Sequence, residues 1–441
     1  MFSLKEKTFP HGVHPPDHKA ETNTLAIRRF PFAPVMVIPL AQHIGKPAIA
    51  AVNEGQEVMR GQVIATADGF MSVPIHAPAS GVVRKIALVP SIAGTMVPGI
   101  YLEPWPGSTQ EQAEGQPCTT DAEPSEIIQA IQQAGIVGLG GAAFPTHVKL
   151  VIPEDTFVDT LIINGVECEP YLTTDHRVML EQTTDIMMGI RYLLKVVNAE
   201  RAIIGVEANK ADAVQQLRQA IPPDLPVTVE SLTVKYPQGA EKILIKALLG
   251  RELPPGKHTI DINAASVNVA TTAEIGRLLP HGRGIQERVI TITGPAIEKK
   301  GNYRIPIGTP LRFALEQAGV KADVSQIFLG GPMMGQAVPN LDIAITKGTS
   351  AVLAFTEAET GIKPHVYPCI HCGACLEACP MGLNPAQLGA LAKVENFPLM
   401  AAQYHLMTCF ECGSCSYVCP AHIPLVHYFR LAKASLKRDA S

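Results

Sequence analysis

Eight of the ten cysteines lie in one stretch near the C-terminus, and they repeat the spacing C-x2-C-x2-C-x3-C-P. The first copy consists of Cys369, Cys372, Cys375, Cys379 and Pro380, and the second of Cys409, Cys412, Cys415, Cys419 and Pro420. Three thiolates on one short loop can reach three irons of an iron–sulfur cube, whereas the fourth, a helical turn later and followed by proline, points toward a second cube. We therefore predict two [4Fe–4S] clusters with crossed ligands, namely Cys369, Cys372, Cys375 and Cys419 for one and Cys409, Cys412, Cys415 and Cys379 for the other.

Two other uses of such cysteines fit the pattern less well. Structural zinc sites pair two C-x2-C knuckles across a longer gap. Disulfides need an oxidising compartment, and residues 1–7 lack the apolar core of a secretory signal. The cysteines therefore indicate one-electron transfer in a reducing compartment.

Composition narrows the class of protein further. A chain of 441 residues is long enough for three to four domains, at roughly 100–200 residues per domain. The net charge of −4 provides no basic footprint for nucleic acid. The most apolar window, residues 31–52, is interrupted by prolines, a histidine and a lysine, so we expect no transmembrane segment.

Residues 1–105 contain short apolar runs punctuated by Pro and Gly, which predict β-strands. The segments around residues 52–64 and 75–83 resemble the lipoyl/biotinyl-carrier family, which implies a flattened β barrel-sandwich domain. Carriers present a lysine in the hairpin between these segments, but residues 68–73 here contain none. We therefore expect an interaction platform rather than a carrier. Residues 106–124 are polar and predict an exposed linker.

The rest of the chain divides into three predicted domains. Strand and helix signals alternate over residues 125–288, beginning with a helix capped by Ser125, and this alternation predicts a Rossmann-like domain with a parallel sheet. Residues 289–355 favour a small ubiquitin-like α+β domain. Residues 356–441 hold the cysteines and should be mostly helical. The predicted fold class is thus multidomain α/β and α+β.

Two motifs in the 125–288 region could bind a ligand. Gly138, Gly140 and Gly141 suit a loop whose N–H groups approach a phosphate, although glycine-rich turns are common without one. Glu167 and Glu169 follow a hydrophobic strand, at the end where parallel sheets bind ligands. Their carboxylates suit ribityl and ribose hydroxyls, or they belong to a solvated turn.

These motifs together resemble the flavin- and NADH-binding subunit of respiratory complex I and related diaphorase subunits. The resemblance implies that FMN and NAD(H) are bound by four elements: Gly138, Gly140, Gly141, Phe144 and Lys149; Asn164, Glu167 and Glu169; Tyr236, Gly239 and Glu241; and Asn268 and Thr271. The chain departs from that family at Leu139, Ala143 and Ala240, where complex I has arginine, glycine and glutamate. These departures bear mainly on the contacts to NADH.

The doubled cysteine runs, the N-terminal barrel and the segment His11-Gly-Val-His14 resemble the C subunit of the Rnf electron-transport complexes. The resemblance implies a ubiquitin-like domain of the SLBB type and electron transfer between NAD(H), FMN and two [4Fe–4S] clusters. It also implies a peripheral position on the cytoplasmic face of the inner membrane. The implied partners are the ferredoxin-like B subunit, integral membrane subunits that transport an ion, and indirectly ferredoxin or flavodoxin.

Two alternatives remain open from the sequence. The chain could be a non-catalytic iron–sulfur adaptor whose flavin domain has decayed. It could also be the diaphorase subunit of a soluble hydrogenase or formate dehydrogenase.

Overall fold

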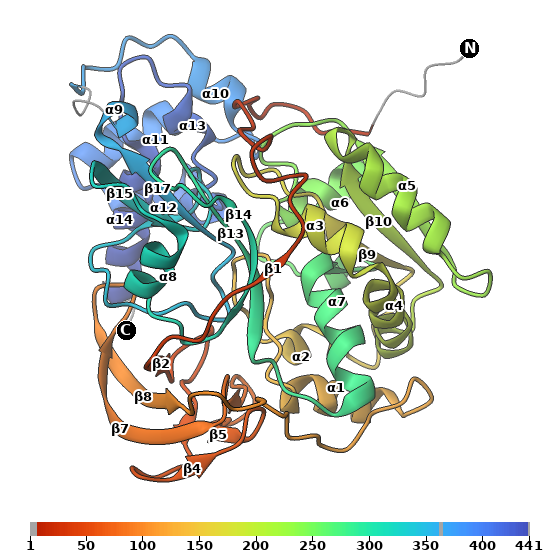
Figure 1. Cartoon of the computed structure of the whole chain (residues 1–441). Coiled ribbons are helices and arrows are strands. Elements are labelled where there is room, and N and C mark those ends of the chain that lie inside the picture. Colours follow the sequence, from red (N-terminus) through yellow and green to blue (C-terminus); the bar gives the residue numbers. More distant parts are fainter. Residues whose placement is uncertain (1–6, 361–364, 440–441) are drawn as a thin grey trace.

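Four buried strands build a parallel sheet in the middle of the chain, in the order β11-β10-β9-β12. The strands are β9 (Thr160–Gly165), β10 (Arg201–Glu207), β11 (Val227–Leu232) and β12 (Ala264–Asn268). Side chains along β9 and β10 are buried on both faces because helices cover the sheet on either side. The computed structural model describes residues 7–360 and 365–439 (Figure 1); residues 1–6, part of the segment on which the expected lack of a secretory signal rests, lie outside them.

The helices of this domain follow the predicted alternation. They are α1 (Pro124–Gln133), α2 (Thr146–Lys149), α3 (Thr174–Glu181), α4 (Thr183–Val197), α5 (Ala211–Ala220), α6 (Glu241–Leu249) and α7 (Val269–Leu278), with 3-10 turns η1 (Ala208–Lys210), η2 (Thr259–Ile262) and η3 (Leu279–His281). The expectation that Ser125 caps the first helix is wrong. Proline is favoured in the first helical turn, so α1 begins at Pro124, and Glu123 forms a capping box with Glu126.

The barrel-sandwich domain packs two small sheets face to face, at the lower edge of the molecule in Figure 1. One contains β2 (Met36–Pro39), β8 (Met96–Pro104), β7 (Gly81–Pro90) and β4 (Glu57–Val58), and the other β3 (Ile49–Ala50), β5 (Val63–Thr66) and β6 (Ile75–His76). The lysine-less hairpin at residues 68–73 lies against the parallel-sheet domain: His147 Nε2 and Phe70 O are 2.7 Å apart, and Gln132 donates to Ser72 O. This hairpin therefore contacts the same chain.

A six-stranded sheet with helix α8 (Leu311–Ala318) forms the α+β domain. Its strands, in spatial order, are β1 (Arg28–Arg29), β14 (Gly301–Pro306), β13 (Glu287–Thr293), β17 (Ala351–Thr356), β15 (Val324–Leu329) and β16 (Gln336–Ala337). Strand β1 pairs in parallel with β14, so an N-terminal segment outside the barrel completes this sheet. Figure 1 shows that segment, in red, crossing the molecule before it reaches the barrel.

The cysteine-rich region is helical, as predicted. It contains α9 (Glu357–Thr360), α10 (Ala374–Ala378), α11 (Pro385–Lys393), α12 (Phe397–Ala402), η4 (Leu406–Thr408), α13 (Ser414–Tyr417) and α14 (Leu425–Asp439). The two cysteine loops share one local geometry. In each loop a glycine in the left-handed backbone conformation, Gly373 (φ 79°) or Gly413 (φ 82°), stands directly before a short helix. Within the described residues, none of the helices is both long and apolar enough to cross a membrane.

The stretch between residues 106 and 124, predicted as an exposed linker, is hydrogen-bonded to the parallel-sheet domain. Its backbone binds the parallel-sheet domain through Gly115 N to Gly282 O and Cys118 N to Leu279 O, and Tyr192 donates its hydroxyl proton to Cys118 O. These contacts fix the barrel to the parallel-sheet domain from a second side.

Helices α4 and α7 approach each other closely at Gly189 of α4. This close contact yields a prediction about stability. A Cβ added at Gly189 would lie 1.9 Å from Thr272 O, a backbone atom that cannot move alone. We expect Gly189→Ala to destabilise the protein by about 1–3 kcal/mol or more through overpacking, although alanine favours a helix by ~1 kcal/mol. Thermal unfolding checks this. The control is Gly389→Ala in α11, where the new Cβ meets only a leucine methyl group; equal loss in both variants would contradict the packing explanation.

Candidate flavin and iron–sulfur sites

Two predicted ligand residues meet at the switch point of the parallel sheet. Asn164 near the end of β9 pairs in register with Asn268 at the end of β12, and the chain reverses its direction of strand addition between these two strands. Open α/β sheets bind ligands outside the carboxyl ends of strands at such a point. The sheet therefore places both asparagines at the expected position of a ligand.

The glycine-rich loop lies beside this switch point and offers unpaired donors. A Cβ at Gly140 would be 3.4 Å from the side chain of Asn268. Among the described residues, the N–H groups of Gly140, Gly141 and Ala142 have no hydrogen-bond partner, and all three residues are exposed. At Gly141 (φ 105°) a Cβ would stand in open space. Consecutive free N–H groups in a turn form a concave anion site, so the loop fits an FMN phosphate.

Buried contacts hold this loop from behind. Leu139 N donates to Thr271 Oγ1 at 2.9 Å, and Asn268 caps α7 by accepting from Ala270 N and Thr271 N. Leu139 itself is 3% exposed and packs into the core. Arg288 on β13 donates to Leu139 O, and burial lowers the pKa of its guanidinium to about 10. A cation of the α+β domain thus lies beneath the loop.

The two glutamates after β9 have their carboxylates occupied by backbone N–H groups. Glu167 accepts from Asp175 N (2.9 Å) and His176 N (3.4 Å) at the start of α3. Glu169 accepts from Met333 N (3.0 Å) and Met334 N (2.8 Å) in the α+β domain. Burial raises the pKa of Glu169 to about 7. Burial, reinforced by Glu167, also raises the pKa of Asp175, which accepts a hydrogen bond from Asn268 Nδ2.

The remaining predicted residues border the same region. Lys149 on α2 forms an ion pair with Glu241 at the start of α6, and both side chains are about one-third exposed (36% and 37%). Asn164 Nδ2 donates to Gly239 O at 2.8 Å, and Phe144 is half-buried. Their contacts with FMN and NAD(H) remain predictions, but their common location agrees with one ligand site.

Tyr236 lies in an interface with the cysteine domain. Its hydroxyl donates to Cys412 O at 2.6 Å, and burial raises the pKa of the phenol. Val13, Tyr236, Ala378 and Cys412 form one buried apolar cluster, against which Cys168 and Met333 pack. The domain with the glycine-rich loop is therefore in direct contact with the cysteine domain.

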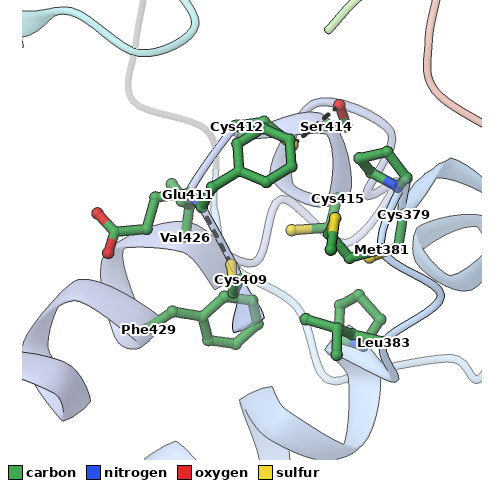
Figure 2. Close-up of a pocket in the computed structure, with 14 residues that line it drawn as sticks. Cys379, Met381, Leu383, Cys409, Glu411, Cys412, Ser414, Cys415, Val426 and Phe429 are labelled. Carbon is green, nitrogen blue, oxygen red and sulfur yellow. Dashed lines mark hydrogen bonds between the residues drawn. The ribbon is translucent and has the colours of Figure 1, made fainter. Parts of the chain in front are cut away.

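The structure groups the cysteines in the crossed manner that the spacing predicts. Cys379 of the first run lines one pocket with Cys409, Cys412 and Cys415 of the second run (Figure 2). Burial, with smaller contributions from Cys412 and Cys379, raises the pKa of Cys409 to about 11, although the Glu411 N–H and Lys433 act in the opposite direction. Cys375 lies close enough to Cys369, Cys419 and Cys372 for these thiols to raise its pKa in addition to burial.

This donor set fits clusters better than single ions. No three His, Cys, Asp or Glu side chains of the described chain converge where one metal ion could bind. A four-iron cube is wider than one ion, so its four thiolates stand further apart. The Nδ1 atoms of His11 and His14 lie within hydrogen-bond distance of Glu377 O (3.0 Å) and Val234 O (3.1 Å).

The structure adds residues to the site that sequence reasoning missed. Arg288 and the buried Lys19 contact the ligand-facing loops through main-chain carbonyls. Nothing in their sequence neighbourhood distinguishes them from surface cations, so only the tertiary contact identifies them.

Family models match four parts of the chain. They are the RnfC barrel sandwich hybrid domain on residues 7–105, the Nuo51 FMN-binding domain on 131–277, the SLBB domain on 289–337 and the 4Fe-4S dicluster domain on 368–423. These matches confirm the predicted fold class and support FMN and two [4Fe–4S] clusters as cofactors.

Curated relatives match over nearly the whole chain. The C subunit of the proton-translocating ferredoxin:NAD(+) oxidoreductase complex of Clostridium ljungdahlii is 41% identical, covering 97% of this chain and 94% of its own. The C subunit of the Na(+)-translocating complex of Acetobacterium woodii is 39% identical, covering 88% and 87%. The C subunit of an ion-translocating oxidoreductase complex of Haemophilus influenzae is 40% identical over 97% of this chain but only 66% of its own.

A solved structure shares the fold at low sequence identity. An NAD+-reducing [NiFe]-hydrogenase in its air-oxidised state matches with a TM-score of 0.51 and 21% identity, covering 72% of this chain and 63% of that one. This likeness concerns the fold alone.

The free N–H groups of the glycine loop yield a prediction about FMN. We expect Gly141→Val to lose FMN. The open space beside Gly141 is where we expect the phosphate, and the valine side chain would occupy it next to the N–H donors. Gly55→Val in the barrel is the matched control, since Gly55 also has a positive φ (82°) and nothing within 4 Å of its added Cβ. Both variants should pay a similar backbone cost of roughly 1–2 kcal/mol. Flavin content of purified protein checks this; full FMN in Gly141→Val would refute the loop assignment.

Crossed ligation yields a second prediction. Cys379→Ala should remove the cluster whose other ligands are Cys409, Cys412 and Cys415, so that iron content falls from about eight to about four per chain. Iron analysis and electron paramagnetic resonance of the reduced protein measure which cluster remains. Cys118→Ala is the control, because Cys118 lies outside both cysteine runs. Loss of the other cluster alone would exclude the crossed pairing.

Proposed function

The chain belongs to the family of C subunits of ion-translocating ferredoxin:NAD(+) oxidoreductase complexes, and we propose that it is the subunit at which such a complex exchanges electrons with NAD(H). It carries FMN in the 131–277 region and two [4Fe–4S] clusters in the 368–423 region. It is an oxidoreductase subunit, and its electron-transfer partners are other subunits of the same complex.

One observation carries this proposal. The parallel-sheet domain, called the flavin-type domain below because it matches the FMN-binding family model, meets the cysteine domain in a buried contact. Tyr236 belongs to one of the predicted flavin-binding elements, and its hydroxyl binds the carbonyl of Cys412, a predicted cluster ligand. FMN when bound accepts two electrons as a hydride and releases them singly to one-electron carriers. A short protein path from Tyr236 to Cys412 supports that use of the two modules.

The residues around the switch point take separate roles in the proposal. The N–H groups of Gly140, Gly141 and Ala142 bind the FMN phosphate, and Thr271 and Asn268 hold their loop. Asn164, Glu169 and the Lys149–Glu241 pair border the side on which NADH approaches.

The exposure of the two cysteine groups supports an order for the clusters. Cys412 and Cys415 are buried, and Cys412 contacts Tyr236, whereas Cys369 and Cys372 are exposed. Ile370 and Tyr367 next to these exposed cysteines are 66% and 55% exposed. We place the cluster of Cys409, Cys412, Cys415 and Cys379 next to the flavin and the cluster of Cys369, Cys372, Cys375 and Cys419 at the exit.

The exposed position of the second cluster indicates where partner subunits would accept electrons. The outer cluster would deliver electrons to the ferredoxin-like B subunit and through it, indirectly, to ferredoxin or flavodoxin. Integral membrane subunits would transport the ion, and this chain would lie at the cytoplasmic face of the membrane. The relatives, which are named as subunits of ion-translocating complexes, support this arrangement.

Cofactor analysis of the anaerobically purified protein tests the function. We expect one FMN and about eight irons with eight sulfides per chain, and we expect NADH to bleach both the flavin and the clusters. A chain that holds both clusters but binds no flavin and is not reduced by NADH would instead be an iron–sulfur adaptor.

The contact between Tyr236 and Cys412 yields a separate prediction. Tyr236→Phe keeps the ring but leaves a buried carbonyl without its donor, at a cost of about 1–3 kcal/mol. We expect flavin reduction by NADH to stay unchanged and the following reduction of the clusters to slow, as measured by anaerobic stopped-flow absorbance. Tyr192→Phe, which removes a hydroxyl bound to Cys118 O and not to the cysteine domain, is the control. Equal cluster reduction in both variants would remove Tyr236 from the path.

A further inference from the structure

A strap of the N-terminal segment, residues 11–19, lies along the edge of the flavin-type domain. Val13 exchanges backbone hydrogen bonds with Tyr236, and Gly12 N donates to Ala378 O beside Cys379. Further along, Tyr171 N donates to Asp17 O, and the rings of His18 and Tyr171 stack 4.6 Å apart at 10°. The strap thus contacts the cysteine domain at one end and the segment after β9 at the other.

Lys19 ends this strap with a buried ammonium group. Its Nζ donates to three main-chain carbonyls, those of Glu167 (2.8 Å), Glu169 (2.9 Å) and Leu172 (2.5 Å). An ammonium has three donors and no acceptor, so this set uses its whole capacity. Because Lys19 is only 5% exposed, water has little access to it.

The three carbonyls belong to the segment that carries the predicted nicotinamide-facing residues. Pointing three carbonyl oxygens at one buried spot is unfavourable without a cation. By satisfying them, Lys19 fixes the turn of residues 167–172 and hence the position of Glu169, whose carboxylate is held at its other end by Met333 N and Met334 N. Leu172 O and Thr173 N share one peptide, and Thr173 N is fixed in turn by Thr291 Oγ1.

The charges around Lys19 are balanced within the protein. Burial and the nearby Lys210 lower its pKa, whereas Glu167 and Glu207 raise it. Lys210 forms a buried pair with Glu207 at 2.6 Å. Lys19 therefore lies at the centre of a buried charged network, beside the ligand region.

We propose that Lys19 is a positioning residue for NADH oxidation: it acts through the carbonyls of Glu167, Glu169 and Leu172 to set the segment against which the nicotinamide is placed. This inference rests on the proposed function. Lys19 touches neither cofactor nor substrate in this role. Displacing reacting groups by ~1 Å can lower a rate by about a hundredfold, so the effect of Lys19 should appear in hydride transfer rather than in cofactor content.

Lys19→Met tests the proposal in the full chain with FMN and clusters loaded. The saturating rate of flavin reduction by NADH, measured by anaerobic stopped flow, should fall about 10- to 100-fold. FMN content and cluster reduction by a reduced viologen, which needs no hydride transfer, should stay at the wild-type level. The control is Lys7→Met on the same N-terminal segment, where an exposed 3.3 Å ion pair with Glu230 is lost; it should match the wild type in all measurements.

The outcomes separate the inference from the proposed function. If wild-type protein with bound FMN is not reduced by NADH, the proposed function fails and the inference with it. An active wild type with an unchanged rate in Lys19→Met overturns the inference alone. If Lys19→Met loses FMN and clusters together, Lys19→Arg decides, because it keeps the charge but shifts the donors. A slowed flavin reduction in loaded Lys19→Arg supports positioning, and a wild-type rate shows that Lys19 serves folding only.

Discussion

Three buried cations each bind main-chain carbonyls of a domain or segment other than their own, and the arrangement of the molecule depends on them. Lys347 is fully buried and donates to Pro74 O of the barrel (2.7 Å) and Gly135 O of the flavin-type domain (2.8 Å). Arg288 binds Thr349 O, Lys347 O and Leu139 O, and Lys19 binds the segment after β9. An isolated buried charge is very costly, so each cation holds its carbonyls together. Burial lowers the pKa of Lys347 to about 7, which reflects that cost.

These contacts hold the four domains in one arrangement, which electron transfer between the FMN-binding domain and the 4Fe-4S domain requires. Domains joined by small polar interfaces normally move relative to one another. Here the barrel is fixed to the flavin-type domain by Lys347, the hairpin at residues 68–73 and the stretch at residues 106–124. Arg288 connects the glycine-rich loop to the α+β domain, and Tyr236 connects the same flavin-type domain to Cys412. Each step from the glycine loop to the cysteines therefore crosses a buried contact rather than a flexible tether.

Local patterns were readable from the sequence, and long-range contacts were not. The cysteine spacing predicts a cluster geometry because it depends on one turn of backbone. The buried strand before Asn164 and the alternation after it predict the sheet edge for the same reason. Lys19 lies 148 positions before Glu167, and Arg288 lies 149 positions after Leu139. No periodicity links such pairs. The error at Ser125 has a local cause. Pro124 and the Glu123–Glu126 capping box together define a helix start two residues before the one that a Ser125 cap would give.

The departures from the complex I family acquire a physical meaning in this fold. Leu139 replaces an arginine of that family, and its side chain packs into the core. The loop nevertheless has a cation beside it, because Arg288 on β13 donates to the Leu139 carbonyl from the interior. Ala143 replaces a glycine and keeps a positive φ of 49°, a conformation that costs a non-glycine residue roughly 1–2 kcal/mol. Its carbonyl accepts from Ile44 N of the barrel segment at 3.1 Å. The barrel domain thus helps to hold the strained end of the glycine-rich loop, so this lysine-less domain has a structural role within the chain.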